Sequence, residues 1–210
     1  LIEPNSNTNH TLYFDNLASM RLPAPAIQEE VMLADYDGTN HLSPIFVNGV
    51  YAADTANPDF TGSNTSAQVA YYARNAVEQY DVGSCGTSSI TDAKPFKDGD
   101  QVFMMDVYTS AAIGTEVLIS LENAALSEGD FPAGRNSQYT GVVEQSNAWH
   151  SVSFVHVGSP DGGTSNVSID EISLLFSPNS NTSDVYYFDN FRYGIINYPH
   201  TFVDGTLLQD

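Results

Sequence analysis

Short segments in which hydrophobic and polar residues alternate recur along the chain. In Glu116–Glu122, for example, Val117, Ile119 and Leu121 occupy every second position. Side chains of a β-strand point alternately to its two faces, so this spacing predicts a strand with one buried face. Further segments rich in β-branched and aromatic residues lie between clusters of Gly, Asn, Ser, Asp and Pro. We predict strands at Gln68–Arg74, Gln101–Tyr108, Glu116–Glu122, Trp149–His156, Val167–Phe176 and Asp184–Arg192.

The same alternation predicts which side chains of three strands face the core. The residues expected to point inward are Val69, Tyr71, Ala73, Phe103, Met105, Val107, Val117, Ile119 and Leu121. The residues expected on the opposite faces are Tyr72, Arg74, Asp106, Tyr108, Leu118, Ser120 and Glu122. No window combines an apolar stripe at helical spacing with capping residues. We therefore expect a nearly all-β chain.

One segment of the sequence occurs twice. Pro4–Thr8 and Tyr13–Asn16 recur as Pro178–Thr182 and Tyr187–Asn190, and nine of the fourteen positions from 4 to 17 match at a constant offset of 174. A repeat this long predicts a tandem array of whole domains rather than a solenoid.

The repeat predicts the domain boundaries. We expect 1–22 to be the last strand of a preceding copy with a linker, 27–194 to be a complete module, and 195–210 to be a linker and the start of a following copy. Pro23, Pro25 and Pro199 mark stiff linkers at the seams. The shared strand sequence also favours strand exchange between molecules. A start at Leu1 without a signal-peptide pattern indicates a fragment of a longer chain.

The charge of the chain limits the classes of partner that it is expected to bind. Among 210 residues, 26 are Asp or Glu and 6 are Lys or Arg, which gives a formal net charge of -20. Binding to nucleic acid or to an anionic membrane depends on basic residues, so neither partner is expected. No apolar run is long enough to span a membrane. Such acidity suits a saline environment or bound divalent cations.

Cysteine and histidine give no sign of catalysis. Cys85 is the only cysteine, so no internal disulfide can form, and we expect an inert thiol in a loop because no basic residue lies close to it in the sequence. The five histidines are scattered, and only His150 and His156 share a predicted strand face, too far apart to hold one zinc ion alone.

Two motifs resemble a known group of proteins. Asn57–Ala70 and Asp184–Asn190 are similar to segments of the jelly-roll carbohydrate-binding modules that are appended to bacterial, often marine, glycoside hydrolases and polysaccharide lyases. The resemblance covers most of Val31–Arg192. It implies an all-β fold, a β-sandwich (jelly roll) of two antiparallel sheets, and glycan binding without catalysis.

The resemblance also implies a structural calcium ion that joins the first strand to the last. The matching positions are Asp35 or Asp37 at one end and Asp189 at the other. Calcium prefers carboxylate and carbonyl oxygens, which this acidic chain supplies. The group usually has Phe-Glu or Phe-Asp where this chain has Tyr36-Asp37, so the ligand at that end is left open.

Candidate sugar-binding residues come from the outward faces and adjoining loops. Aromatic rings stack on sugars, whereas Arg, Asn and carboxylates make paired hydrogen bonds to hydroxyls. The candidates are Tyr72, Arg74, Asp106 and Glu122 on strands, with Tyr80, Asn123, Arg135 and Tyr139 in adjoining loops. Trp149 is either a sugar platform or a structural residue, and we favour the structural role.

A catalytic pair of carboxylates is not expected. Jelly-roll glucanases carry Glu-x-Asp-x-x-Glu, and the nearest string here, Ser168–Ser173, has Ser where a flanking Glu is needed. Asp170 and Glu171 are adjacent, so in a strand they face opposite sides.

We therefore hypothesise a secreted or cell-surface module that binds a neutral β-glucan, laminarin first, and targets an attached glycoside hydrolase or lyase. Two alternatives stay open. One is a structural spacer or adhesin repeat, and the other is a binder of acidic or sulfated algal polysaccharide (alginate, agar or porphyran, carrageenan), for which Arg74 and Arg135 would receive the acidic sugar. A hydrolase or lyase is a third, less favoured reading.

Overall fold

The computed structural model describes residues 26–197, which form one compact unit. The predicted strand and linker at 1–22, the repeated segment Pro4–Leu17 and most of 195–210 lie outside the described residues. The eleven strands and two short helices are β1 (Ala26–Ala34), β2 (Leu42–Val47), β3 (Val50–Ala56), β4 (Gln68–Ala73), β5 (Gly83–Thr87), α1 (Lys94–Asp98), β6 (Gln101–Thr109), β7 (Glu116–Glu122), α2 (Ala124–Ser127), β8 (Arg135–Val142), β9 (His150–Gly158), β10 (Glu171–Phe176) and β11 (Val185–Asn197).

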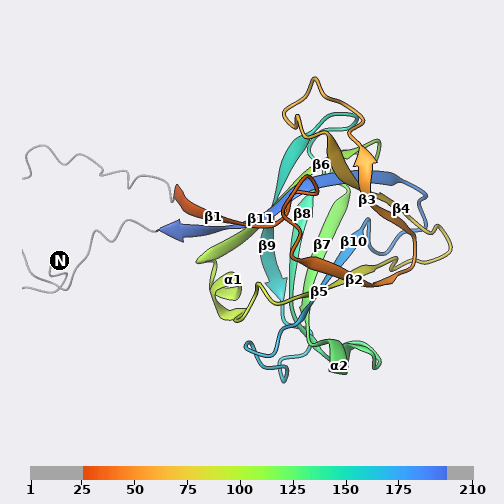
Figure 1. Ribbon diagram of the computed structural model, residues 1–210. Helices are drawn as coiled ribbons and strands as arrows, with labels where there is room; N and C mark the ends of the chain where they lie inside the picture. The colour runs from red at the N-terminus through yellow and green to blue at the C-terminus, as the bar shows by residue number, and fades with distance from the viewer. Residues whose placement is uncertain (1–25, 198–210) are drawn as a thin grey trace, which may run out of the picture. The chain divides into compact units, whose positions relative to one another are not determined.

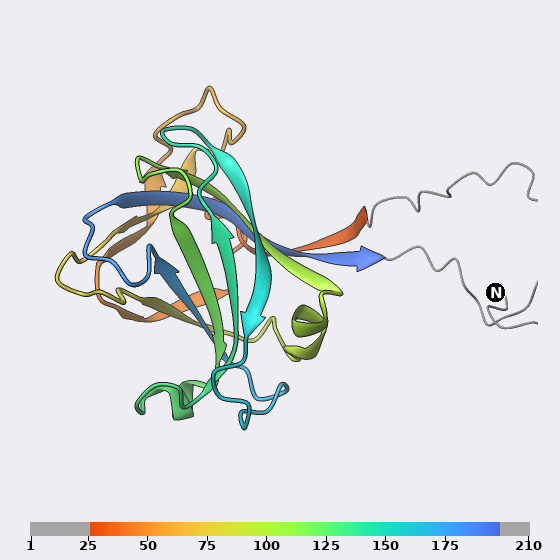
Figure 2. The same cartoon turned by 180° about the vertical axis from the view of Figure 1, so that it is seen from behind.

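All strand pairs are antiparallel, and the sheet curls round like a barrel into two facing layers (Figure 1 and Figure 2). One layer has the order β2-β5-β10-β7-β8, and we call it the pocket sheet. The opposite sheet has the order β9-β6-β11-β4-β3, with β1 paired to the second half of β11. This arrangement confirms the predicted all-β jelly-roll sandwich.

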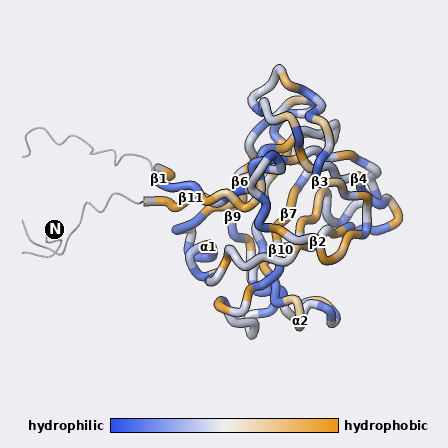
Figure 3. The backbone as a smooth tube through the Cα atoms, in the orientation of Figure 1, coloured by the Kyte–Doolittle hydropathy of each residue, from blue (hydrophilic) through white to orange (hydrophobic). Residues whose placement is uncertain are grey.

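The two sheets meet where β8 pairs with β9 over three residue pairs, from Gln138 to Thr140. Gly141 follows at this corner because a side chain would not fit. A Cβ there would lie 2.4 Å from Cγ1 of Val152 and 2.8 Å from the carbonyl oxygen of Ser153. Figure 3 shows hydrophobic and hydrophilic parts of the backbone interspersed throughout the strands.

The core lies between the two layers. Val117, Ile119 and Leu121 of β7 are fully buried there, and so are Phe103, Met105 and Val107 of β6. The face assignments for these two strands are therefore confirmed. The short helix α1 adds Phe96, which stacks on Phe103 at a ring-centroid distance of 4.2 Å.

The face assignment for β4 is wrong. Tyr72 points into the core, where its ring lies 5.5 Å from that of Phe176 and its hydroxyl donates a hydrogen bond to Asp81 at 2.7 Å. Tyr71 is on the other face, 5.4 Å from Tyr187 of β11. Two adjacent tyrosines, Tyr71 and Tyr72, point to opposite faces of this strand, so alternation alone did not decide which face is buried.

Each of the six predicted strands overlaps a strand of the structure, but β1, β2, β3, β5 and β8 were not predicted. Cys85 therefore lies in β5 and not in a loop, and burial raises the pKa of its thiol to about 11, which agrees with an inert cysteine. In the described part of the chain, no helix is long and apolar enough to cross a membrane.

Candidate functional site

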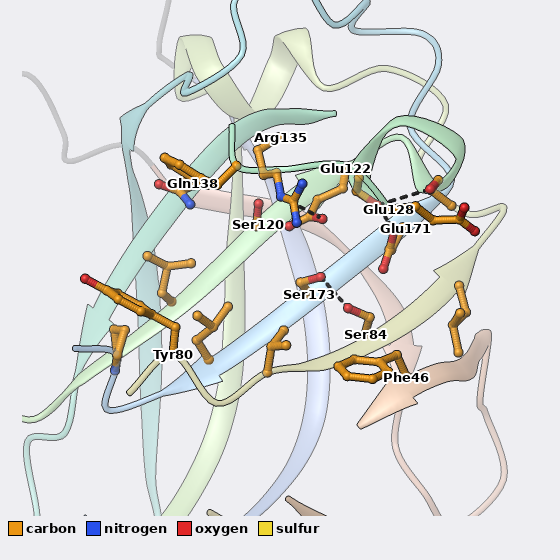
Figure 4. Close-up of a pocket in the computed structure, with 18 of the residues that line it drawn as sticks. Phe46, Tyr80, Ser84, Ser120, Glu122, Glu128, Arg135, Gln138, Glu171 and Ser173 are labelled. Atoms are coloured by element: carbon orange, nitrogen blue, oxygen red, sulfur yellow. Dashed lines mark hydrogen bonds and ion pairs between the residues drawn. The ribbon is translucent and has the colours of Figure 1, made fainter. Parts of the chain in front are cut away.

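A large cavity lies on the face of the pocket sheet that is turned away from the core. It has a volume of about 1200 Å³. The alternation of side chains in β7 determines which residues form the floor of the cavity. The odd-numbered residues face the core, whereas Leu118, Ser120 and Glu122 face the cavity. Glu171 and Ser173 of β10 do the same on the neighbouring strand (Figure 4).

Two buried glutamates dominate the floor. Glu122 and Glu171 are directly paired across β7 and β10, and their exposed fractions are 5% and 6%. Nε of Arg135 lies 3.5 Å from Oε2 of Glu122. Ser127 of α2 donates a hydrogen bond from Oγ to Oε2 of Glu171 at 2.7 Å. The floor is therefore acidic, with each carboxylate held by a different partner.

Burial raises the pKa of Glu122, because a charge is poorly solvated there, and the nearby Glu171 carboxylate raises it further. The Ser120 and Ser173 hydroxyls and the Arg135 guanidinium oppose this rise. The surroundings of Glu122 thus disfavour its charged form. A hydrogen-bond donor placed against the carboxylate would stabilise that form.

Serine hydroxyls complete the floor. Ser84 of β5 and Ser173 of β10 share a hydrogen bond of 2.6 Å. Ser120 is only 1% exposed, and its hydroxyl oxygen makes no hydrogen bond of ordinary geometry to any described residue. Hydroxyls donate and accept, so together with the two carboxylates they offer a polar surface suited to a ligand rich in hydroxyl or amino groups.

The rim of the pocket is aromatic. Phe46 of β2, Tyr80 before β5 and Phe131 after α2 line the pocket and are exposed. Figure 4 shows Tyr80 and Phe46 beyond the Ser84–Ser173 pair, away from Arg135 and Glu122. Exposed rings around a polar floor are the arrangement that lets sugars stack while their hydroxyls are bound.

The α2 segment forms one end of the pocket, and Asn123 positions it. Asn123 caps the helix by accepting a hydrogen bond from Leu126 N at 3.2 Å, and its Nδ2 donates to Ser168 O at 2.7 Å. Gly134 closes the segment with a φ of +76°, and a Cβ there would lie 2.5 Å from Ser127 N. Asn123, a predicted ligand residue, thus holds the pocket wall.

The structure brings three of the eight predicted ligand residues into the pocket. They are Tyr80, Glu122 and Arg135. Tyr72 and Tyr139 instead belong to the core, where the Tyr139 hydroxyl donates to Ser137 Oγ at 2.9 Å. The core position of Tyr72 corrects the expectation of an outward ring, and Tyr139 lies in β8 and not in the expected loop.

Arg74 is also buried away from the pocket floor. Its Nη1 donates to Thr182 O at 2.8 Å, and its Nη2 donates to Ser180 O at 2.9 Å. The guanidinium therefore clamps the turn between β10 and β11. Arg74 is bound to the turn, and Arg135 faces Glu122. The two arginines therefore do not form the joint site that was expected to receive an acidic sugar.

Asp106 lies on the opposite sheet. It accepts a hydrogen bond from Nδ2 of Asn190 at 2.9 Å and forms an ion pair with Arg192 at 3.4 Å. Trp149 is buried, and its indole Nε1 donates to Oδ1 of Asn57 at 2.9 Å. This geometry agrees with the structural role favoured for Trp149.

The sequence reasoning missed four floor residues: Ser84, Ser120, Glu171 and Ser173. The alternation in β7 predicts Ser120 on the outward face, but nothing in the sequence marks it as a ligand residue. The signal for Glu171 and Ser173 was their alternation with Ile172 and Leu174, which are both in the core. Asp170 is exposed while Glu171 is buried in the pocket, so these two carboxylates do face apart, as expected.

The three residues implied as calcium ligands have separate partners. Asp35 accepts hydrogen bonds from the backbone of Gly38 and Thr39, and Asp37 accepts from the backbone of Gln68. Asp189 is fully buried and accepts from Nδ2 of Asn64 at 2.7 Å.

Within residues 26–197, no three His, Cys, Asp or Glu side chains come together as a metal site. A calcium ion would therefore depend on backbone and amide oxygens, with Asp189 as the buried carboxylate. All three carboxylates already accept backbone N–H groups, since Asn190 N also donates to Oδ1 of Asp189 at 2.8 Å, but Asp189 alone of the three is fully buried.

No protein-family model and no curated protein matches the sequence. Among solved structures, a family 30 carbohydrate-binding module matches with a TM-score of 0.50 and 11% identity over 79% of this chain and 98% of that chain. A family 11 module of a cellulosomal cellulase of Clostridium thermocellum matches with a TM-score of 0.49 and 14% identity, over 84% of this chain and 99% of that chain.

An exo-β-agarase matches with a TM-score of 0.48 and 12% identity over 77% of this chain, which spans only 24% of that enzyme's length. At such identities the likeness concerns the fold alone. The described part of the chain has the β-sandwich fold seen in a family 30 carbohydrate-binding module.

Proposed function

We propose that the described unit is a non-catalytic module that binds polysaccharide in the pocket of the pocket sheet. The observation that carries this proposal is the combination of an aromatic rim with a polar, largely buried floor in one cavity of about 1200 Å³. Exposed Tyr80 and Phe131 offer rings for stacking, and Glu122 and Glu171 offer acceptors for sugar hydroxyls.

The charge of the pocket favours an uncharged ligand over an anionic one. Glu116, Glu122, Glu128 and Glu171 line it against a single basic residue, Arg135. An anionic sugar would meet like charge, which costs binding energy in a partly desolvated site. Laminarin is therefore the first ligand to test, and alginate, agar or porphyran and carrageenan are the less favoured alternatives.

We further propose that the parent chain is secreted or displayed at the cell surface, carries neighbouring copies of this module, and is attached to a glycoside hydrolase or lyase. Support for the neighbouring copies comes from the repeated segment Pro4–Leu17. The attached enzyme and the location rest on the resemblance of Asn57–Ala70 and Asp184–Asn190 to modules of such enzymes.

Calorimetry with laminarin, agarose, alginate and carrageenan tests the binding proposal. We expect laminarin to bind, and Tyr80→Ala to weaken it by about tenfold, because the loss of one stacking ring costs on the order of 1.4 kcal/mol. Phe60→Ala is a matched control, since Phe60 is 56% exposed against 58% for Tyr80 but lies outside the pocket.

Two results would contradict the proposal. Failure of every polysaccharide to bind would favour the spacer or adhesin reading. The appearance of new reducing ends or unsaturated products would show an enzyme instead of a non-catalytic module.

A further inference from the structure

The pocket floor has more negative charge than its own residues neutralise. Arg135 is the one basic residue of the pocket, and its Nη1 is already bound to the carbonyl oxygens of Gly129 and Ala133 at 3.2 and 2.7 Å. Its Nε faces Glu122 alone. Glu171 has a hydroxyl partner, Ser127, but no Lys, Arg or His of the described residues lies within 4.0 Å of it. One buried carboxylate therefore has no cation.

A second observation lies beside this carboxylate. Ser120 is two residues from Glu122 on the same face of β7 and is 1% exposed, and its buried hydroxyl oxygen makes no hydrogen bond of ordinary geometry to any of residues 26–197. A buried polar group without a partner is costly, and it needs an explanation such as a ligand group that completes it. Figure 4 shows Ser120 on the pocket floor, near Arg135 and Glu122.

Three acceptors thus lie in one part of the floor, beside Arg135: the carboxylates of Glu122 and Glu171 and the hydroxyl oxygen of Ser120. Glu122 and Glu171 are cross-strand partners, and such neighbours lie about 5 Å apart at Cβ. A primary ammonium group carries three N–H donors and one positive charge, so it matches both the number of acceptors and the missing charge. A hard divalent cation fits less well, because it needs six or more oxygen ligands or several waters.

We propose that this position is a subsite for the ammonium group of an amino sugar, so that a glucosamine polymer binds more tightly than a neutral glucan of the same linkage. The inference rests on the proposed function and deepens it. The aromatic rim favours a pyranose ring over a lysine-rich peptide as the carrier of the ammonium group, because stacking needs a flat apolar face.

Calorimetry with three sets of oligomers tests this subsite: glucosamine oligomers, their N-acetylated forms, and glucose oligomers of the same linkage and length. The measurements are made at about 0.15 M ionic strength, where screening within about 8 Å suppresses attraction to the net charge of the whole protein. We expect the glucosamine oligomers to bind at least about tenfold more tightly than the other two sets, since hydrogen bonds to charged groups contribute more than neutral ones.

Two variants separate the subsite from general electrostatics. Glu171→Gln keeps the shape of the side chain but removes its charge, so in this variant the affinity for glucosamine oligomers should fall to that for glucose oligomers. Glu128→Gln removes the same charge from the exposed rim and should keep the preference. Oligolysine serves as a cationic ligand without a sugar ring.

Each result is decisive. Equal affinity for all three oligomer sets would overturn the amino subsite and leave the proposed function standing, whereas no binding of any oligomer or polysaccharide would overturn both. If Glu171→Gln still preferred glucosamine oligomers, the ammonium group would not be bound at Glu171, and the proposed subsite would be wrong. Oligolysine binding as tightly as glucosamine oligomers, and lost in Glu171→Gln, would show a general cation site instead of a sugar subsite.

Discussion

Glu122 illustrates how one position in a strand acquires a chemical role. Its place on the outward face follows from the alternation in β7, but its acidity depends on neighbours from other strands. Arg135 of β8 and Glu171 of β10 are the charged groups that face it, and the Ser120 and Ser173 hydroxyls lie close by. The raised pKa of Glu122 is therefore a property of the assembled pocket and not of β7 alone.

Glu122 should make the stability of the fold depend on pH. A carboxyl whose pKa is raised on folding binds its proton more tightly in the folded state, so the stability it contributes is present at low pH and is lost as the pH rises through the raised pKa. Glu122→Gln has no such loss. Its free energy of unfolding relative to wild type should therefore increase from about pH 4 to about pH 7.

Urea unfolding at a series of pH values measures this difference. Glu128→Gln, at an exposed rim position, should run parallel to wild type. A difference between Glu122→Gln and wild type that stays constant with pH would contradict the prediction.

At the scale of elements, two connecting segments build the ends of the pocket. One is the α2 segment, capped by Asn123, and the other is the turn between β10 and β11, which contributes Pro178 and Asn179. Arg74 fastens this turn through Thr182 and Ser180. An arginine chosen as a sugar ligand on sequence grounds thus stabilises the pocket indirectly.

Replacing Arg74 should be costly. Arg74→Ala removes a buried side chain and the donors to the carbonyl oxygens of Ser180 and Thr182, and we expect the free energy of unfolding to fall by about 3 kcal/mol in urea titrations. Lys94→Ala, which removes an exposed side chain paired with Asp98 on α1, should change it by less than about 0.5 kcal/mol. A loss in Arg74→Ala as small as that of the control would show that the clamp does not stabilise the turn.

At the scale of the whole molecule, β11 links most of the opposite sheet. It pairs with β1, β4 and β6, and its Asp189 is fully buried. Calcium at Asp189 remains a prediction, as does the tandem array. An ion there would connect the last strand to β1, because Ala34 pairs with Phe191 two residues away.

Calcium binding should raise the melting temperature. An ion that binds only the folded state stabilises it by mass action, so we expect the wild-type Tm to rise by several degrees with millimolar calcium and to fall back with a chelator. Asp189→Asn should lose this response, whereas Asp170→Asn, at an exposed position, should keep it. A wild-type Tm that is indifferent to calcium would refute the site.

Local alternation was sufficient to predict the all-β class, the core faces of β6 and β7, and the place of Glu122, because the direction of a side chain in a strand depends on its own backbone. It was insufficient for β4, where Tyr71 and Tyr72 offer a ring to each face. The composition likewise determined the acidity of the molecule.

Only the tertiary structure decided the rest. β5 and β8 are rich in Gly, Ser and Asn, and they become strands through pairing with distant segments, which overrides their weak propensity. The same pairing places Glu171 opposite Glu122, nearly fifty residues away in the sequence, and buries Arg74 and Tyr139. Contacts between distant segments depend on sheet register, and no local pattern of residues encodes that register.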